Sequence, residues 1–156
     1  MAYSSLFKLD THDLRSEAEV ETRLLAPLFK DLNYPATSII PKKSVPPLLV
    51  ASGSKKVPVQ VDFILKALPG TAKVVVEAKD PKKSLSDAWG QAAGYALTYN
   101  ADKSDLDRIK WLLISNGHIT SLYQHDSSQP TLTLQLTDFV SGAPPLRGTS
   151  LLHKVF

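Results

Sequence analysis

Two acids and a lysine interrupt or end two apolar stretches of this sequence, and their spacing suits a shared site. Residues 74–79 are three valines followed by Glu77 and, two positions on, Lys79. A run of valines predicts a buried strand, and side chains alternate across a strand, so Glu77 and Lys79 should share one face. Asp62 lies inside a second apolar run, residues 60–65. If the two strands pair, Asp62 lies beside Glu77.

These residue types match the needs of phosphodiester hydrolysis. The reaction places negative charge on phosphate oxygens, which Mg²⁺ stabilises while lowering the pKa of bound water. Because Mg²⁺ prefers oxygen ligands and keeps several waters, one or two carboxylates and the substrate phosphate suffice. A lysine held on a rigid strand beside the acids adds a positive centre that needs no reorganisation. The three side chains therefore indicate a divalent cation and a phosphodiester.

Two helices are predicted to flank these strands. Apolar residues recur at helical spacing over residues 14–32, with Asp13 as N-cap and Glu17 near the first turn, where the helix dipole favours acids. Pro27 should kink this helix or start a new one. The second helix is indicated by an amphipathic stripe over residues 85–96, whose small residues allow close packing on the sheet.

Other strands join these two in the expected sheet. All of its strands together are predicted at residues 36–40, 60–65, 74–79, 111–114, 119–123 and 131–136. Asn116-Gly117 is a strong hairpin turn, and Pro69-Gly70 is a turn signal. Residues 42–57 are expected to be an exposed, mobile, basic loop, after which Pro58 opens the next strand. The order of helix, strands, helix and strands predicts an α/β or α+β class around a central mixed sheet flanked by helices.

Composition narrows the class of protein. The chain has 156 residues, enough for a single domain over 1–156, with residues 141–156 as a docked tail or a linker to a further domain. No apolar run approaches the roughly 18 residues of a membrane span. The absence of cysteine excludes disulfides and thiolate zinc sites and fits a cytoplasmic protein. A net charge of +3 permits a polyanionic partner. We find no nucleotide-binding glycine motif and no hydrolase elbow.

The residues taken together resemble the D…E-x-K signature of the restriction-endonuclease-like nuclease superfamily. Asp62 precedes Glu77-Ala78-Lys79 by fifteen residues, and the segment from Gln91 to Tyr95 matches a Q-x-x-x-Y element. That element marks the nuclease domains of recombination helicase-nucleases and the N-terminal nuclease domain of type I restriction enzyme R subunits, to which the likeness is closest. Ser115-Asn116-Gly117 resembles the T-N-G after the last core strand. The resemblance runs from roughly Glu17 to Tyr123.

The resemblance implies a metal-dependent DNA endonuclease. Asp62 and Glu77 would be ligands of Mg²⁺, for which Mn²⁺ should substitute, and the backbone carbonyl of Ala78 would be a third ligand. Lys79 would orient the attacking water or stabilise the phosphate in the transition state.

The two helices would complete this site. Gln91 and Tyr95, four residues apart on one helix face, would steady the lysine and the metal. A glutamate of the first helix would add a ligand, and Glu21 is favoured over Glu17. Asn33 stands where relatives usually have glycine, a departure that affects a turn and not the chemistry.

DNA is the partner that the resemblance implies, together with helicase or translocase and modification subunits or domains in defence against foreign DNA, and no membrane. Six lysines are candidates for holding the DNA backbone: Lys42, Lys43, Lys55, Lys56, Lys82 and Lys83. The alternative is a catalytically silent module of the same fold, used for DNA binding or assembly.

Overall fold

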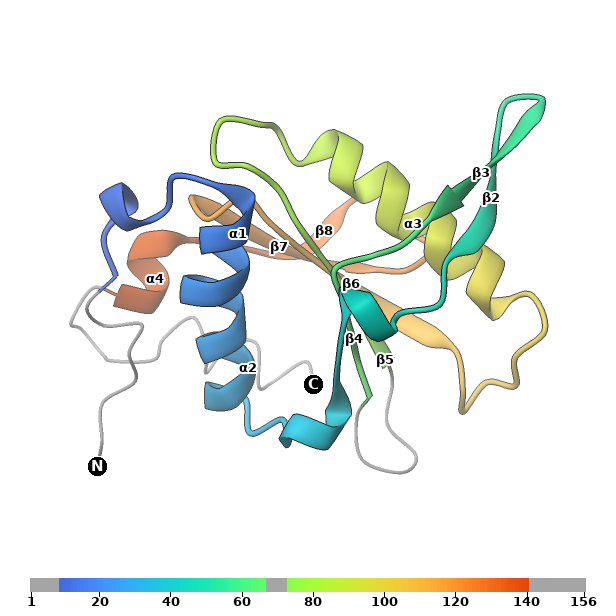
Figure 1. The fold of residues 1–156 in the computed structure, drawn as a ribbon, viewed down its shortest axis with the longest axis horizontal. Coiled ribbons are helices and arrows are strands. Elements are labelled where there is room, and N and C mark those ends of the chain that lie inside the picture. The colour runs from blue at the N-terminus through green and yellow to red at the C-terminus, as the bar shows by residue number, and fades with distance from the viewer. Residues whose placement is uncertain (1–8, 67–72, 141–156) are drawn as a thin grey trace.

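A six-stranded mixed sheet forms the centre of the protein (Figure 1). The structure is a computed structural model that describes residues 9–66 and 73–140. The strand order is β1-β4-β5-β6-β7-β8, and β5 and β6 run parallel while the other neighbours are antiparallel. The strands are β1 (Ile39–Pro41), β4 (Phe63–Leu65), β5 (Lys73–Ala78), β6 (Ile109–Ser115), β7 (Ile119–Gln124) and β8 (Pro130–Gln135). The predicted fold class is confirmed.

Helices cover both faces of this sheet. On one face lies the N-terminal helix, made of α1 (Glu17–Glu19), a π-helical segment (Val20–Leu25) and α2 (Ala26–Asp31), and on the other lies α3 (Ser86–Asn100) (Figure 1). A short 3-10 turn (Thr11–Asp13) precedes the first, and α4 (Leu136–Val140) follows the last strand.

Strand β5 supplies both cores because its side chains alternate. Val74, Val76 and Ala78 pack with the N-terminal helix, whereas Val75 packs with the alanines of α3. All four are fully buried. The valine run therefore forms the predicted buried strand, with a hydrophobic layer on each side.

The N-terminal helix begins later than predicted and passes Pro27 without a break. Ser16, and not Asp13, is the N-cap, and its side chain accepts a hydrogen bond from the Glu19 amide at 3.3 Å. The π-helical segment precedes Pro27, with the Ala26 amide bonded to the Glu21 carbonyl five residues back. Pro27 then falls in the first turn of α2, the part of an α-helix that best tolerates proline.

Asn33 ends the turn after this helix in a left-handed conformation, with φ of 64°. Glycine adopts this conformation without strain, and asparagine tolerates it better than most residues. Asparagine in place of the usual glycine therefore affects the turn at this position, as the sequence predicts.

The prediction of a mobile loop over residues 42–57 is wrong. The segment holds a 3-10 turn (Lys42–Ser44) and a hairpin of β2 (Leu48–Ser52) and β3 (Lys55–Val59). Gly53 makes the hairpin turn possible with φ of +62°. Pro58 does not open the next strand but lies within β3 opposite Leu49, where a two-stranded sheet leaves an edge that tolerates proline.

The hairpin is docked on α3, beyond which its tip projects (Figure 1). A Cβ atom at Gly94 of α3 would lie 2.9 Å from Val50 Cγ1, so the absence of a side chain there permits the contact. The sequence did not predict this hairpin because the segment is rich in lysine and most of its residues are exposed. Only a few apolar side chains are partly buried in it: Leu48, Val50 and Val59.

Several other boundaries differ from prediction. Of residues 36–40, Ala36–Ser38 form a 3-10 turn and only the last two lie in a strand. Residues 60–62 precede β4 without joining it, and Leu136 starts α4 and does not end β8. The Asn116-Gly117 hairpin turn and the strand pair around it are confirmed. The Pro69-Gly70 turn signal and the tail over 141–156 lie outside the described residues. Within the described ranges, no helix is long and apolar enough to cross a membrane.

Candidate metal centre

Asp62 and Glu77 come together where β4 begins and β5 ends. Phe63 pairs with Val76, so Asp62, one residue before β4, is placed beside Glu77 and Ala78. Its Oδ2 atom accepts a hydrogen bond from the Ala78 amide at 2.8 Å. Both carboxyl groups are almost fully buried, with 1% of each residue exposed. The neighbouring strands therefore deliver the two acids as predicted.

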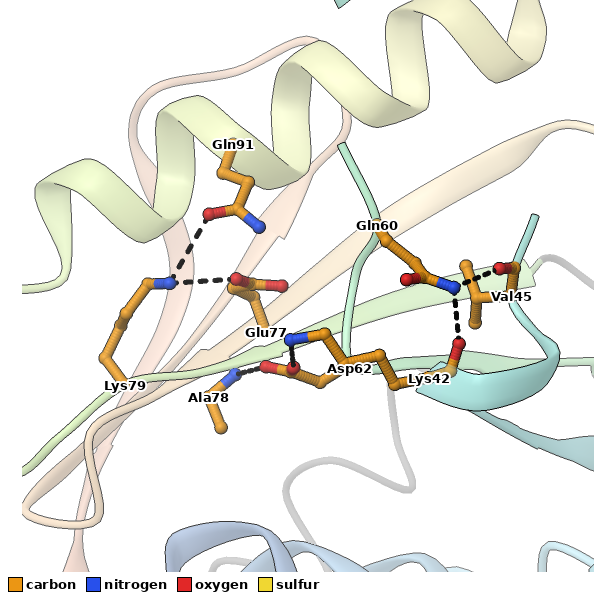
Figure 2. Close-up of polar contacts among 8 residues, drawn as sticks. All are labelled: Lys42, Val45, Gln60, Asp62, Glu77, Ala78, Lys79 and Gln91. Carbon is orange, nitrogen blue, oxygen red and sulfur yellow. Dashed lines mark hydrogen bonds and ion pairs between the residues drawn. The ribbon is translucent and has the colours of Figure 1, made fainter. Parts of the chain in front are cut away.

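Lys79 lies on the same side of β5 as Glu77 (Figure 2). Its Nζ is 2.9 Å from Glu77 Oε1 and donates to Gln91 Oε1 on α3 at 3.4 Å. Because the Lys79 amide also bonds to the Ser115 carbonyl on β6, the backbone that carries the ammonium is fixed. Glu77, Lys79 and Gln91 thus form one contiguous group.

Tyr95 does not join that group. Its hydroxyl donates to the carbonyl of Pro46 at 2.8 Å, in the segment that leads into the β2–β3 hairpin. Burial, followed by the neighbouring Tyr99, raises the pKa of Tyr95 to about 12, so the hydroxyl keeps its proton as a donor. The structure therefore brings Gln91 to the lysine and gives Tyr95 a contact that fixes the hairpin.

Glu77 is held in conditions that oppose its charge. Burial raises the pKa of Glu77 to about 7, and the charge of Asp62 adds to the effect, while Lys79 and then Lys42 act in the opposite direction. Glu77 Oε2 is buried and has no hydrogen-bond partner among the described residues. Burying a carboxylate oxygen without a partner is costly, and a bound cation is one way to satisfy it.

The N-terminal helix adds two acids to Asp62. One carboxylate oxygen from each of Glu17, Glu21 and Asp62 lies within 4.8 Å of the others. Four residues apart on one helix, Glu17 and Glu21 face the same way and are both half-buried. The pKa of Glu21 is raised, chiefly by burial and then by the negative charges of Asp62 and Glu17. The positive charge of Lys42 partly offsets this rise. The structure brings both glutamates to Asp62, where the sequence favoured one.

Lys42, which the sequence suggested as a contact for DNA, pairs with Asp62 in the structure. Its Nζ lies 3.0 Å from Asp62 Oδ1, and Asp62 is the fully buried member of this ion pair. Gln60, which the sequence analysis did not single out, donates from Nε2 to the carbonyls of Lys42 and Val45 at 2.7 and 2.6 Å. The only sequence feature that pointed to Gln60 is that its polar amide stands at the start of an apolar run. The other candidate lysines are exposed at the surface: Lys43, Lys55, Lys56, Lys82 and Lys83.

A hollow with basic walls is lined in part by residues that are close in the sequence to those of this centre. Its volume is about 350 Å³, and it is lined by His12, Leu14, Arg15, Pro81, Lys82 and His118. Arg15 precedes Glu17 by two residues and Lys82 follows Lys79 by three, so the hollow is built from segments that leave the centre. The Asn116 side chain donates to the Lys83 carbonyl at 2.9 Å and ties two of its walls together. No acid lines it.

Comparison with known proteins identifies the fold. No protein-family model and no curated protein matches the chain. Among solved structures it is similar to a chain of the cryo-EM structure of the DrdV–DNA complex, with a TM-score of 0.56 and 16% sequence identity. The match covers 100% of this chain and 14% of that one, so this chain spans about a seventh of its length. The likeness shows that the mixed sheet with flanking helices is shared.

Proposed function

We propose that this chain is a Mg²⁺-dependent DNA endonuclease domain of the restriction-endonuclease-like superfamily, related in design to the nuclease domain of type I restriction R subunits and acting in the cytoplasm against foreign DNA. The observation that carries the proposal is the convergence of Asp62, Glu77 and Lys79 where β4 begins and its partner β5 ends. The buried, unpartnered Glu77 Oε2 supports a cation in this position.

The residues present fit a hard divalent cation. Asp62 and Glu77, joined by Glu21 or Glu17 and the Ala78 carbonyl, would hold it, and an all-oxygen set is what Mg²⁺ and Mn²⁺ take. When bound, Mg²⁺ supplies positive charge to the phosphate and lowers the pKa of bound water. Four acids gathered with two lysines leave an excess of negative charge that such a cation offsets.

The chain's own groups then position the substrate. Lys79 is held between Glu77 and Gln91, so its ammonium is fixed before a phosphate arrives and can steady either the attacking water or a phosphate oxygen. Gln91 gives the Lys79 ammonium a second hydrogen-bond acceptor beside Glu77. The Ala78 amide fixes the plane of the Asp62 carboxylate.

Support for DNA as substrate comes from charge and from the fold. The basic hollow, which Arg15 and Lys82 line, suits a phosphate of the backbone. The similar solved chain is in a complex with DNA, according to its name. Because this chain matches a seventh of that one, we propose that translocase and modification domains or subunits accompany it.

Plasmid nicking in Mg²⁺ or Mn²⁺ tests the proposal. The parent protein should nick, while Asp62→Ala and Lys79→Ala should be at least about a hundredfold slower. Lys110→Ala, at the opposite end of β6 from Ser115, is the matched control and should behave as the parent. Equal nicking by the parent and both site variants would overturn the proposal.

A dependence on a translocase would leave the isolated domain silent, so cation binding is the second measurement. Mn²⁺ titration followed by electron paramagnetic resonance should show binding by the parent and none by Asp62→Ala. Absence of binding by the parent would exclude the metal centre.

One observation favours a second candidate function, a DNA-holding module without catalysis. The basic hollow does not depend on the acidic centre for its contacts. For this candidate, DNA retention should weaken with salt, Arg15→Gln and Lys82→Gln should each lower the salt slope by about one, and no Mn²⁺ should bind.

A further inference from the structure

The 3-10 turn at Lys42–Ser44 delivers a positive charge to the acidic centre from outside the two strands that form it. The Lys42 ammonium is 3.0 Å from Asp62 Oδ1, the oxygen that the Ala78 amide does not use. Figure 2 shows Lys42 and Lys79 reaching Asp62 and Glu77 from opposite ends. Asp62 is thus provided with a cation from its own chain.

The backbone of this turn is firmly held. Pro41, at the end of β1, pairs with Phe63 of β4, next to Asp62. Gln60 donates to the carbonyls of Lys42 and Val45, and Tyr95 donates to the carbonyl of the next residue, Pro46. The position from which the Lys42 side chain starts is therefore fixed by three separate elements.

The side chain itself is free to leave. Half of it is exposed, 51%, whereas the Asp62 side chain is completely buried. An exposed ammonium on a flexible stem can exchange a carboxylate for another anion at little cost. Asp62, in contrast, has no access to bulk water and needs a cation in either state.

We propose that Lys42 is a tethered counter-cation of the metal centre, which neutralises Asp62 until a divalent cation takes its place and then moves to a phosphate of the bound DNA. This inference rests on the proposed function. Two cations cannot share one carboxylate oxygen without repulsion, so Lys42 lowers the affinity for the divalent cation. Lys42 and the divalent cation are thereby coupled, and the ammonium moves to a DNA phosphate only after the divalent cation has neutralised Asp62.

Mn²⁺ titration of four proteins without DNA tests the competition. Lys42→Met, which keeps the apolar stem, should bind Mn²⁺ about tenfold more tightly than the parent. Lys42→Arg keeps the charge and should stay near the parent value. Lys43→Met removes a charge one residue away, from a side chain that is exposed, and should change the affinity less than about twofold. Each variant is first checked for an unchanged thermal unfolding curve.

Binding by Lys42→Met that is equal to the parent's, or weaker, would overturn the inference and leave the metal centre intact. The same holds if Lys43→Met tightens binding as much as Lys42→Met does. Failure of all four proteins to bind Mn²⁺ would instead overturn the proposed metal centre, and this inference with it. The two failures are therefore distinguishable.

The move to phosphate is tested by the salt dependence of DNA binding. In Ca²⁺, which takes the same oxygen ligands, the slope for Lys42→Met should be smaller than the parent's by about one. In EDTA the two slopes should agree, because Lys42 then stays on Asp62. Equal slopes in both buffers would overturn the transfer of Lys42 to DNA.

Discussion

The two sides of the acidic centre differ in how their charges are satisfied. On the α3 side, Glu77 faces Lys79, the residue directly after β5, and leaves one oxygen unpartnered among the described residues. On the side of the N-terminal helix, Asp62 has a partner for each oxygen, one from the Ala78 amide and one from Lys42. Each acid therefore faces one lysine, but Glu77 keeps an oxygen without a partner among the described residues, whereas both oxygens of Asp62 are engaged. A cation bound here would find one carboxylate oxygen open, that of Glu77, and would have to displace Lys42 from Asp62.

Replacing Asp62 breaks both sides at once and should have the largest effect. Asp62→Asn keeps the shape of the side chain but removes the charge that faces Lys42, Glu17 and Glu21. We expect Mn²⁺ affinity to fall by more than about a hundredfold and nicking to disappear. Mn²⁺ titration and a nicking assay measure the two losses. An unchanged affinity would mean that the cation is held without Asp62.

Replacing Lys79 breaks only the α3 side. Lys79→Ala should slow nicking by roughly 10²–10³-fold while leaving Mn²⁺ affinity within a few-fold, because the lysine positions substrate and does not ligate the cation. Gln91→Ala, which acts through the lysine, should lose about 10–100-fold. Single-turnover nicking beside Mn²⁺ titration separates the two parameters. Loss of Mn²⁺ binding in Lys79→Ala would contradict this division.

Glu77→Gln should stabilise the fold at alkaline pH. The folded-state pKa of Glu77, about 7, is above its ordinary value of 4.5, so the folded protein retains this proton more strongly than the unfolded chain. The parent accordingly has this contribution in full below pH 4.5 and loses it as the pH rises through about 7. In EDTA, the free energy of unfolding of Glu77→Gln relative to the parent should rise by about 3 kcal/mol between pH 4.5 and pH 8.

Urea unfolding at the two pH values measures this difference. Asp87→Asn, on the exposed surface of α3, serves as a control for an acid without burial. A difference that does not change with pH would show that Glu77 is not held in a charge-opposing environment, and would weaken the contrast between the two sides.

The smallest effect is expected at Tyr95. Tyr95→Phe removes the hydrogen bond to the Pro46 carbonyl and should cost about 1 kcal/mol of stability, with nicking reduced less than tenfold. Gln91→Ala on the same helix should show the reverse, a small change in stability and a larger one in rate. Equal rate losses in the two variants would place Tyr95 in the catalytic group after all.

The sequence was a good guide to the α3 side because its contacts are local or follow from strand alternation. Glu77 lies in β5 and Lys79 follows that strand directly, two residues on, and the valine run made the strand evident. Gln91 lies on a helix whose stripe of alanines is equally plain. Alternation and helical periodicity are sufficient to place these three side chains.

The contacts on the side of the N-terminal helix could not be predicted from alternation or periodicity. Lys42 reaches Asp62 across twenty residues, through a hairpin segment whose lysines and prolines indicated a loop. Gln60 and Tyr95 hold that segment through backbone carbonyls, which any sequence offers. Because such contacts depend on tertiary packing and not on residue type, composition suggested DNA as the partner of Lys42 while the fold gives it Asp62.

The π-helical segment at Val20–Leu25 has a consequence for how the acidic residues are aimed. A π-type turn takes up an extra residue, so everything before it is rotated by about 100° relative to an uninterrupted α-helix. Glu17 is upstream of the segment and Glu21 within it, while the buried leucines that anchor the helix extend to its far end. Deleting a single residue there would restore regular helix and swing Glu17 away from Asp62, with every side chain of the centre still encoded.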